Sequence, residues 1–228
     1  MSYVAYMFTF LVLYHDGVMY VCVVVDKCRN PLDLVFVVDV AGTTSDANWQ
    51  LVRAFMMDMI DELEIGTQYT RVGLIAVSET ATHEFFLNTH STADNIKNAI
   101  NNVNFRGGSL DIVNGLNQVA TQYSVTNGER ATAVNVVVVI LDTLPTNSDS
   151  AVLAAALNVQ SSSSVAMYAV GVTEAVTSSN VLPNLASDPS MLNLNYFTAT
   201  AHSNLDSLVS PMETQICAAV EPSPGDHT

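Results

Sequence analysis

The chain has 228 residues and a net charge of -15, because 22 Asp and Glu stand against only 7 Lys and Arg. Apolar residues make up 49% of it and charged residues 13%, which is typical of a globular protein and argues against disorder. This length suits one α/β domain with a full core. The charge argues against nucleic acid and anionic membranes as partners, since both are bound through clustered Lys and Arg. It permits a cation or a basic protein.

Two apolar runs, 4–14 and 18–25, open the chain with a short polar break between them. Each is shorter than the ~20 residues that a helix needs to span a bilayer, so membrane insertion is not expected. The first run has the length of a signal-peptide core, but no basic residue precedes it and no clear cleavage site follows. For residues 1–27 a secretory leader, an extra strand and an imperfect gene start therefore stay open as alternatives.

From Pro31 onward, short apolar runs rich in β-branched residues alternate with stretches of helical periodicity. We predict strands at 34–38, 72–77, 84–87 (an edge strand), 134–141, 165–172 and 196–199. We predict helices at 49–63, 92–103, 112–123, 149–159, 181–186 and 204–217, the last kinked at Pro211. This alternation predicts an α/β fold with a doubly wound, mostly parallel six-stranded sheet and helices on both faces. The domain would span 28–217, and 218–228 would be a tail or the start of a linker.

Two aspartates directly follow buried strands of the predicted sheet: Asp39 after 34–38 and Asp142 after 134–141. Ligands of doubly wound sheets bind at the carboxyl ends of strands, where the strand order reverses. Two neighbouring buried carboxylates repel each other, and a divalent cation relieves that repulsion. Each aspartate taken alone suits equally well a cap on the loop or helix that follows.

Four segments resemble von Willebrand factor A domains in their order and spacing. They are the strand 31–39 (PLDLVFVVD), the strand 70–78 (TRVGLIAVS), the loop 105–109 (FRGGS) and the strand 136–142. The resemblance covers roughly 28–217. It implies a non-catalytic protein-binding or adhesion module of a secreted or cell-surface protein, whose partner is a matrix or cell-surface protein.

The family's metal-ion-dependent adhesion site holds a divalent cation, and an Asp or Glu of the partner completes its coordination. Carried over to this chain, the resemblance implies Mg²⁺ (or Mn²⁺ or Ca²⁺) held by Asp39, Thr43, Ser109 and Asp142. Ala41 stands where the family has a serine ligand, and it has no side-chain oxygen. Thr143 stands where the family usually has Gly, and Leu110 is an extra residue beside the loop. Two hypotheses follow: metal-dependent adhesion through a partial site, or a metal-independent structural or interaction module with a dead site.

Three cysteines occur, Cys22, Cys28 and Cys217. Cys28 precedes the first predicted strand of the domain and Cys217 ends the last helix, so a Cys28–Cys217 disulfide would tie both ends of one domain together. Such bridges are typical of extracellular modules. Cys22 would then be lost with a leader or pair with another chain. Unpaired thiols in a reducing cytosol are the alternative.

An enzyme hypothesis comes from the same strand end. The segment 39–43 (DVAGT) also resembles the opening of haloacid-dehalogenase-type phosphatases, in which the first Asp is the nucleophile. Ala41 replaces the second acid of that motif, and neither Lys27 nor Lys97 lies at a suitable strand end. The chain has no phosphate loop and no Gly-x-Ser-x-Gly elbow, and its 5 histidines are too scattered for a zinc cluster. Catalysis is therefore not expected.

Overall fold

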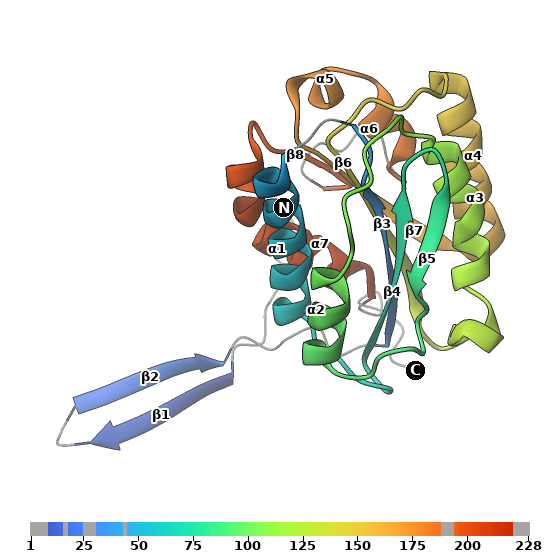
Figure 1. Ribbon diagram of the computed structural model, residues 1–228. Coiled ribbons are helices and arrows are strands. Elements are labelled where there is room, and N and C mark those ends of the chain that lie inside the picture. The colour runs from blue at the N-terminus through green and yellow to red at the C-terminus, as the bar shows by residue number, and fades with distance from the viewer. Residues whose placement is uncertain (1–8, 16–17, 25–30, 43–44, 188–193, 221–228) are drawn as a thin grey trace, which may run out of the picture.

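The computed structural model describes residues 9–15, 18–24, 31–42, 45–187 and 194–220 (Figure 1). Six strands form one sheet in the order β5-β4-β3-β6-β7-β8. They are β3 (Leu32–Asp39), β4 (Thr70–Val77), β5 (Ala81–Phe85), β6 (Val134–Leu141), β7 (Val165–Gly171) and β8 (Tyr196–Thr198). Within this sheet β5 pairs antiparallel with β4, and the other neighbours are parallel. The predicted doubly wound, mostly parallel six-stranded sheet is confirmed.

Helices cover both faces of the sheet, as Figure 1 shows. One face carries α1 (Asp46–Glu62), α2 (Ala93–Asn101) and α7 (Val209–Val220). The other carries α3 (Ile112–Gln122), α4 (Asp149–Ser163) and α6 (Val181–Leu185). Successive side chains of a strand point to opposite faces. Leu34 and Phe36 of β3 therefore enter the first core, while Val35 and Val37 enter the second.

Three helices that follow parallel strands begin with a hydroxyl cap. Ser45, Ser148 and Thr173 each accept a hydrogen bond from the backbone N–H three residues further on, at the starts of α1, α4 and α5 (Glu174–Thr177). Such caps satisfy one of the free N–H groups of the first turn. Because the caps follow β3, β6 and β7, three helix N-termini lie at the carboxyl edge of the sheet.

Several element boundaries differ from the prediction, and one helix was not expected. The edge strand begins at Ala81 rather than at residue 84, because the backbone N–H of Ser78 bonds the carbonyl of Thr80 and closes a tight turn right after β4. Helix α4 continues past residue 159 to Ser163 and ends where Ser164 adopts a left-handed conformation. The four-residue α5 was not predicted.

The last predicted helix consists of two elements, a 3₁₀ helix η2 (His202–Leu208) and then α7. Pro211 is the third residue of α7. The N–H groups of a first turn have no partner within the helix, so proline is tolerated there. The helix changes from 3₁₀ to α between Leu208 and Val209, and the kink at Pro211 stays a prediction.

The segment before the domain contains β1 (Thr9–His15) and β2 (Val18–Val24), which pair antiparallel as a two-stranded sheet of their own. The backbone thus matches the extra-strand alternative, while a cleaved leader stays a hypothesis. Within the described residues no helix is both long and apolar enough to cross a membrane.

Candidate functional site

The candidate site lies where β3 and β6 end side by side. These strands are parallel, and Val38 is level with Ile140. In the sheet, β3 has β4 on one side and β6 on the other. From β3 the chain first adds strands on the β4 side and then crosses over to add β6, β7 and β8 on the other side, so the strand order reverses at this point. Asp39 ends β3 and Asp142 directly follows β6. The structure therefore brings the two predicted aspartates together at the sheet's switch point, as expected for a ligand site.

Asp39 is 4% exposed and is held by backbone N–H groups. Its Oδ1 accepts from Ala41 N at 2.8 Å, and its Oδ2 accepts from Thr143 N at 2.9 Å and from Asp142 N at 3.3 Å. Burial, and then the charge of Asp142, raise the pKa of Asp39 from 3.8 to about 7 despite these donors. Near neutral pH Asp39 therefore holds a proton for much of the time.

Asp142 receives two side-chain partners. The Thr143 hydroxyl donates to Oδ1 at 3.1 Å, and His202 Nε2 lies 3.1 Å from Oδ2. The side chains of Asp142 and His202 are only 6% and 10% exposed. The Thr173 hydroxyl donates to the Asp142 carbonyl at 2.9 Å. The segments after β6, β7 and β8 thus converge on one residue, Asp142.

His202 is a site residue that the sequence analysis missed. It lies 60 positions beyond Asp142, at the start of η2. Neither strand periodicity nor a spacing motif connects the two residues. Only the return of the chain through β8, the strand beside β7, places His202 near the end of β6.

The residues after Asp39 pack tightly against neighbouring loops. Ala41 is fully buried and belongs to the core beneath α3 and α4. Gly42 has φ +76°, and a Cβ added there would lie 2.2 Å from the Thr143 hydroxyl oxygen. Gly42 N also donates to the Gly108 carbonyl at 2.8 Å, which fixes the Gly-Gly loop against the end of β3. Thr43, one of the predicted ligands, lies outside the described residues.

Ser109, the other predicted hydroxyl ligand, lies on the exposed surface of the Gly-Gly loop. Its hydroxyl makes a long hydrogen bond of 3.5 Å to Glu79 Oε1, in the turn after β4. The next residue, Leu110, is fully buried, and its carbonyl accepts from Thr146 N at 2.9 Å. This extra residue anchors the loop in the core, and Ser109 is left beside Glu79.

The described donor set does not fit Mg²⁺. That ion needs about six oxygen ligands in near-ideal octahedral geometry. Ala41 supplies no side-chain oxygen, and all four oxygens of Asp39 and Asp142 already lie within hydrogen-bond distance of protein donors. In the part of the chain that the structure describes, no group of three or more His, Cys, Asp or Glu could hold a metal ion. Mg²⁺ held by Asp39, Thr43, Ser109 and Asp142 stays a prediction, against which this chemistry argues.

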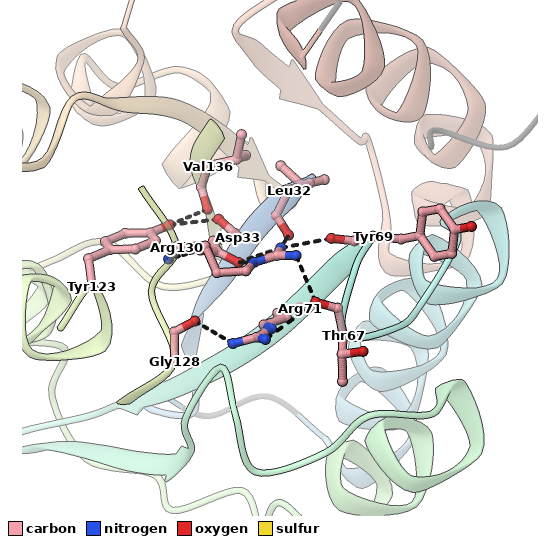
Figure 2. A network of polar contacts seen from close by, with 9 residues as sticks. All are labelled: Leu32, Asp33, Thr67, Tyr69, Arg71, Tyr123, Gly128, Arg130 and Val136. Atoms are coloured by element: carbon pink, nitrogen blue, oxygen red, sulfur yellow. Dashed lines mark hydrogen bonds and ion pairs between the residues drawn. The ribbon is translucent and has the colours of Figure 1, made fainter. Parts of the chain in front are cut away.

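At the opposite end of β3, where the parallel strands begin, lies a different buried acid, Asp33 (Figure 2). Arg130 donates to its carboxylate through the backbone N at 2.8 Å, Nε at 3.0 Å and Nη2 at 2.7 Å. The same guanidinium bonds the carbonyls of Leu32, Thr67 and Tyr69. This network joins β3 to the loops around it and is fully paired, so we interpret it as structural.

A family model described as von Willebrand factor type A domain matches residues 33–211. The chain belongs to the von Willebrand factor type A family. Mouse matrilin-4 is 31% identical over 197 residues, which are 82% of this chain and 31% of matrilin-4. Chicken integrin alpha-1 is 38% identical over 85 residues, 37% of this chain and 29% of the integrin. The chain thus covers less than a third of these two curated relatives.

Solved structures show the same fold. Proximal thread matrix protein 1 from the mussel byssus matches with a TM-score of 0.75 at 20% identity, over 84% of this chain and 49% of that one. Another structure of that protein, described as having a zinc-occupied MIDAS motif, matches with a TM-score of 0.68 at 23% identity, over 85% and 47%. At this identity the likeness concerns the A-domain fold alone.

The curated relatives are extracellular matrix or cell-surface adhesion proteins, and their A domains are non-enzymatic modules that mediate protein–protein interactions. The predicted family and the extracellular or cell-surface localisation are therefore confirmed. Cys217, in α7, is disulfide-bonded. The side chains of Cys22 and Cys28 lie outside the described residues, so the Cys28–Cys217 pairing stays a prediction.

Proposed function

We propose that this A domain is a non-catalytic protein-binding module and that its ligand surface is the carboxyl edge of the sheet. The observation that carries the proposal is the convergence of the loops after β3, β6, β7 and β8 on the Asp39–Asp142 pair. This edge is also where doubly wound folds bind their ligands. Glu79 and Ser109 are exposed beside it and offer polar contacts to a partner.

Two observations support the absence of catalysis. Asp39, the nucleophile of the phosphatase hypothesis, is almost fully buried, and both of its oxygens accept backbone hydrogen bonds. Lys97 lies on α2 and pairs with Asp61 of α1, so it is engaged away from the carboxyl edge of the sheet. Among the described residues of this edge nothing supports phosphoryl transfer, and we propose binding without turnover.

We further propose that the partner binds without a bridging cation. In the metal-dependent alternative, an Asp or Glu of the partner would complete the coordination shell of the ion. Without a cation, an incoming carboxylate would meet Glu79 and the Asp39–Asp142 pair, and like charges repel. A neutral or basic segment of a matrix or cell-surface protein suits this edge better, on a chain with net charge -15.

The test is a binding assay of the immobilised domain against a panel of purified matrix and cell-surface proteins, in Mg²⁺ and in EDTA. For a partner found this way, the double variant Glu79→Gln/Ser109→Ala should weaken binding about fivefold or more, because it removes polar contacts at the proposed surface. The matched control is Glu62→Gln, at the far end of α1. Equal effects of the two variants would contradict the proposed surface, and loss of binding in EDTA would favour the metal-dependent alternative.

A further inference from the structure

We propose that His202 and Thr143 take the place of the divalent cation at the Asp39–Asp142 pair, so that the domain holds its ligand-binding edge in one metal-free arrangement. The proposal rests on the proposed function for the meaning of that edge. Its tests use metal and heat without any partner, so failure to find a ligand and failure of this inference are distinguishable.

The first step concerns Asp142, whose two oxygens each have a different side-chain partner, the Thr143 hydroxyl and the His202 imidazole. A buried carboxylate needs either donors or a cation to offset its lost hydration. These two side chains supply the donors from the protein itself. A cation that coordinated Asp142 Oδ2 directly would have to displace the imidazole, which is 10% exposed and held between loops.

The second step concerns the space beside Asp39. The Thr143 side chain packs over Gly42 so closely that a Cβ on Gly42 would meet its hydroxyl oxygen at 2.2 Å. Ala41, directly before Gly42, points a methyl group into the core and offers no ligand oxygen. Two departures from the family pattern, at positions 41 and 143, thus act together with His202. Ala41 withdraws a ligand, and Thr143 and His202 satisfy the acid that the ligand set would have shared.

The third step concerns what a cation does for such a site, namely to hold several loops in a fixed arrangement. Here His202 joins the segment after β8 to the end of β6, and Thr173 joins the loop after β7 to the same residue. Asp39 accepts from Thr143 N and so joins β3 to the loop after β6. The protein therefore makes by hydrogen bonds the connections that metal ligation would otherwise provide.

The first test measures metal binding to the whole chain. We expect the melting temperature to be the same in about 5 mM MnCl₂ or MgCl₂ as in EDTA. A cation bound with a dissociation constant of about 0.1 mM would raise it by about 5 °C or more at that concentration. We also expect no bound Mn²⁺ in the paramagnetic resonance spectrum. One tightly bound Mn²⁺ that Asp39→Asn abolishes would overturn the proposal.

The second test restores the family pattern with Ala41→Ser and Thr143→Gly, and in the same chain removes the imidazole from Asp142 with His202→Ala. If His202 and Thr143 occupy the role of the cation, this variant should bind one Mn²⁺ and gain a metal-dependent rise in melting temperature. Circular dichroism confirms that it is folded. A folded triple variant that binds no Mn²⁺ would overturn the proposed substitution.

A third comparison decides the matter if the triple variant does not fold. His202→Ala removes the donor to Asp142, whereas His202→Gln keeps a side-chain N–H that can reach it. We expect the Ala variant to melt several degrees below wild type in EDTA and the Gln variant to recover at least half of the loss. Equal melting temperatures for wild type and His202→Ala would mean that the imidazole does not hold the site, which contradicts the proposal.

Discussion

Strand β3 carries one buried aspartate near each end, and the two have opposite surroundings. Asp33, at 0% exposed, faces the guanidinium of Arg130, whereas Asp39, at 4% exposed, faces another acid, Asp142. A buried charge that faces a permanent opposite charge needs no further partner to offset its lost hydration. A buried pair of like charges needs a proton, a cation or added donors. The difference explains why the Asp33 end of β3 holds the fold together, whereas the Asp39 end is where we propose that a ligand binds.

The largest expected effect comes from breaking the Asp33–Arg130 ion pair at the start of β3. Arg130→Met would leave Asp33 buried without its cation, and loss of one partner of a buried ion pair costs about 3–5 kcal/mol. Urea unfolding monitored by circular dichroism measures this change. A loss below about 1 kcal/mol would mean that the two ends of β3 do not differ as described.

The second prediction concerns how the free energy of unfolding depends on pH through Asp39, at the end of β3. The pKa of Asp39 is raised to about 7, so the folded state holds a proton that the unfolded chain releases near pH 4. Stability conferred by this proton is present at low pH and is lost as pH rises from about 4 to 7, by at most about 1.4 kcal/mol per pH unit. In Asp39→Asn this loss should be absent, so the variant should gain on wild type between pH 5 and pH 8. The measurement is the unfolding free energy of Asp39→Asn minus that of wild type at each pH from 5 to 8. A difference that does not change with pH would contradict the account.

The third prediction tests the contact between Gly42 and Thr143. Gly42→Ala should destabilise the domain by about 1–3 kcal/mol, because it combines a positive φ with a clash against the Thr143 hydroxyl. Adding Thr143→Ala should return part of that loss, since it removes the clashing oxygen and leaves the backbone strain. A double-mutant cycle with no coupling between the two positions would show that these loops do not touch.

The smallest expected effect is at a more exposed ion pair. Arg106 and Glu84 form a salt bridge whose side chains are 30% and 23% exposed, unlike the buried Arg130–Asp33 pair. Glu84→Gln should cost less than about 1 kcal/mol, because solvent screens such pairs. If its loss in urea unfolding equals that of Arg130→Met, burial is not what separates the two pairs.

The sequence was sufficient to predict the layers of the fold and the pair at its centre. Continuous β-branched runs such as Val134–Leu141 are typical of strands buried on both faces, and an acid right after such a run lies at the sheet edge. Boundaries set by turns, such as the early start of β5, were less accessible because they depend on backbone hydrogen bonds within a few residues. The short α5 leaves too few positions for a periodicity.

The partners of the buried acids were not predictable. Arg130 lies 97 positions from Asp33, and His202 lies 60 positions from Asp142. Arg130 comes from a loop and His202 is the first residue of a 3₁₀ helix, so no strand or α-helix periodicity fixes the direction of either side chain. The absence of an oxygen at Ala41 was visible in the sequence, but what replaces the lost ligand depends on these distant contacts.

The most direct measurement is a crystal structure of the chain grown in MnCl₂ and recorded at the manganese absorption edge. We predict no anomalous peak between Asp39 and Asp142, with His202 Nε2 within hydrogen-bond distance of Asp142. An anomalous peak on that pair, with the imidazole turned away, would contradict the metal-free account.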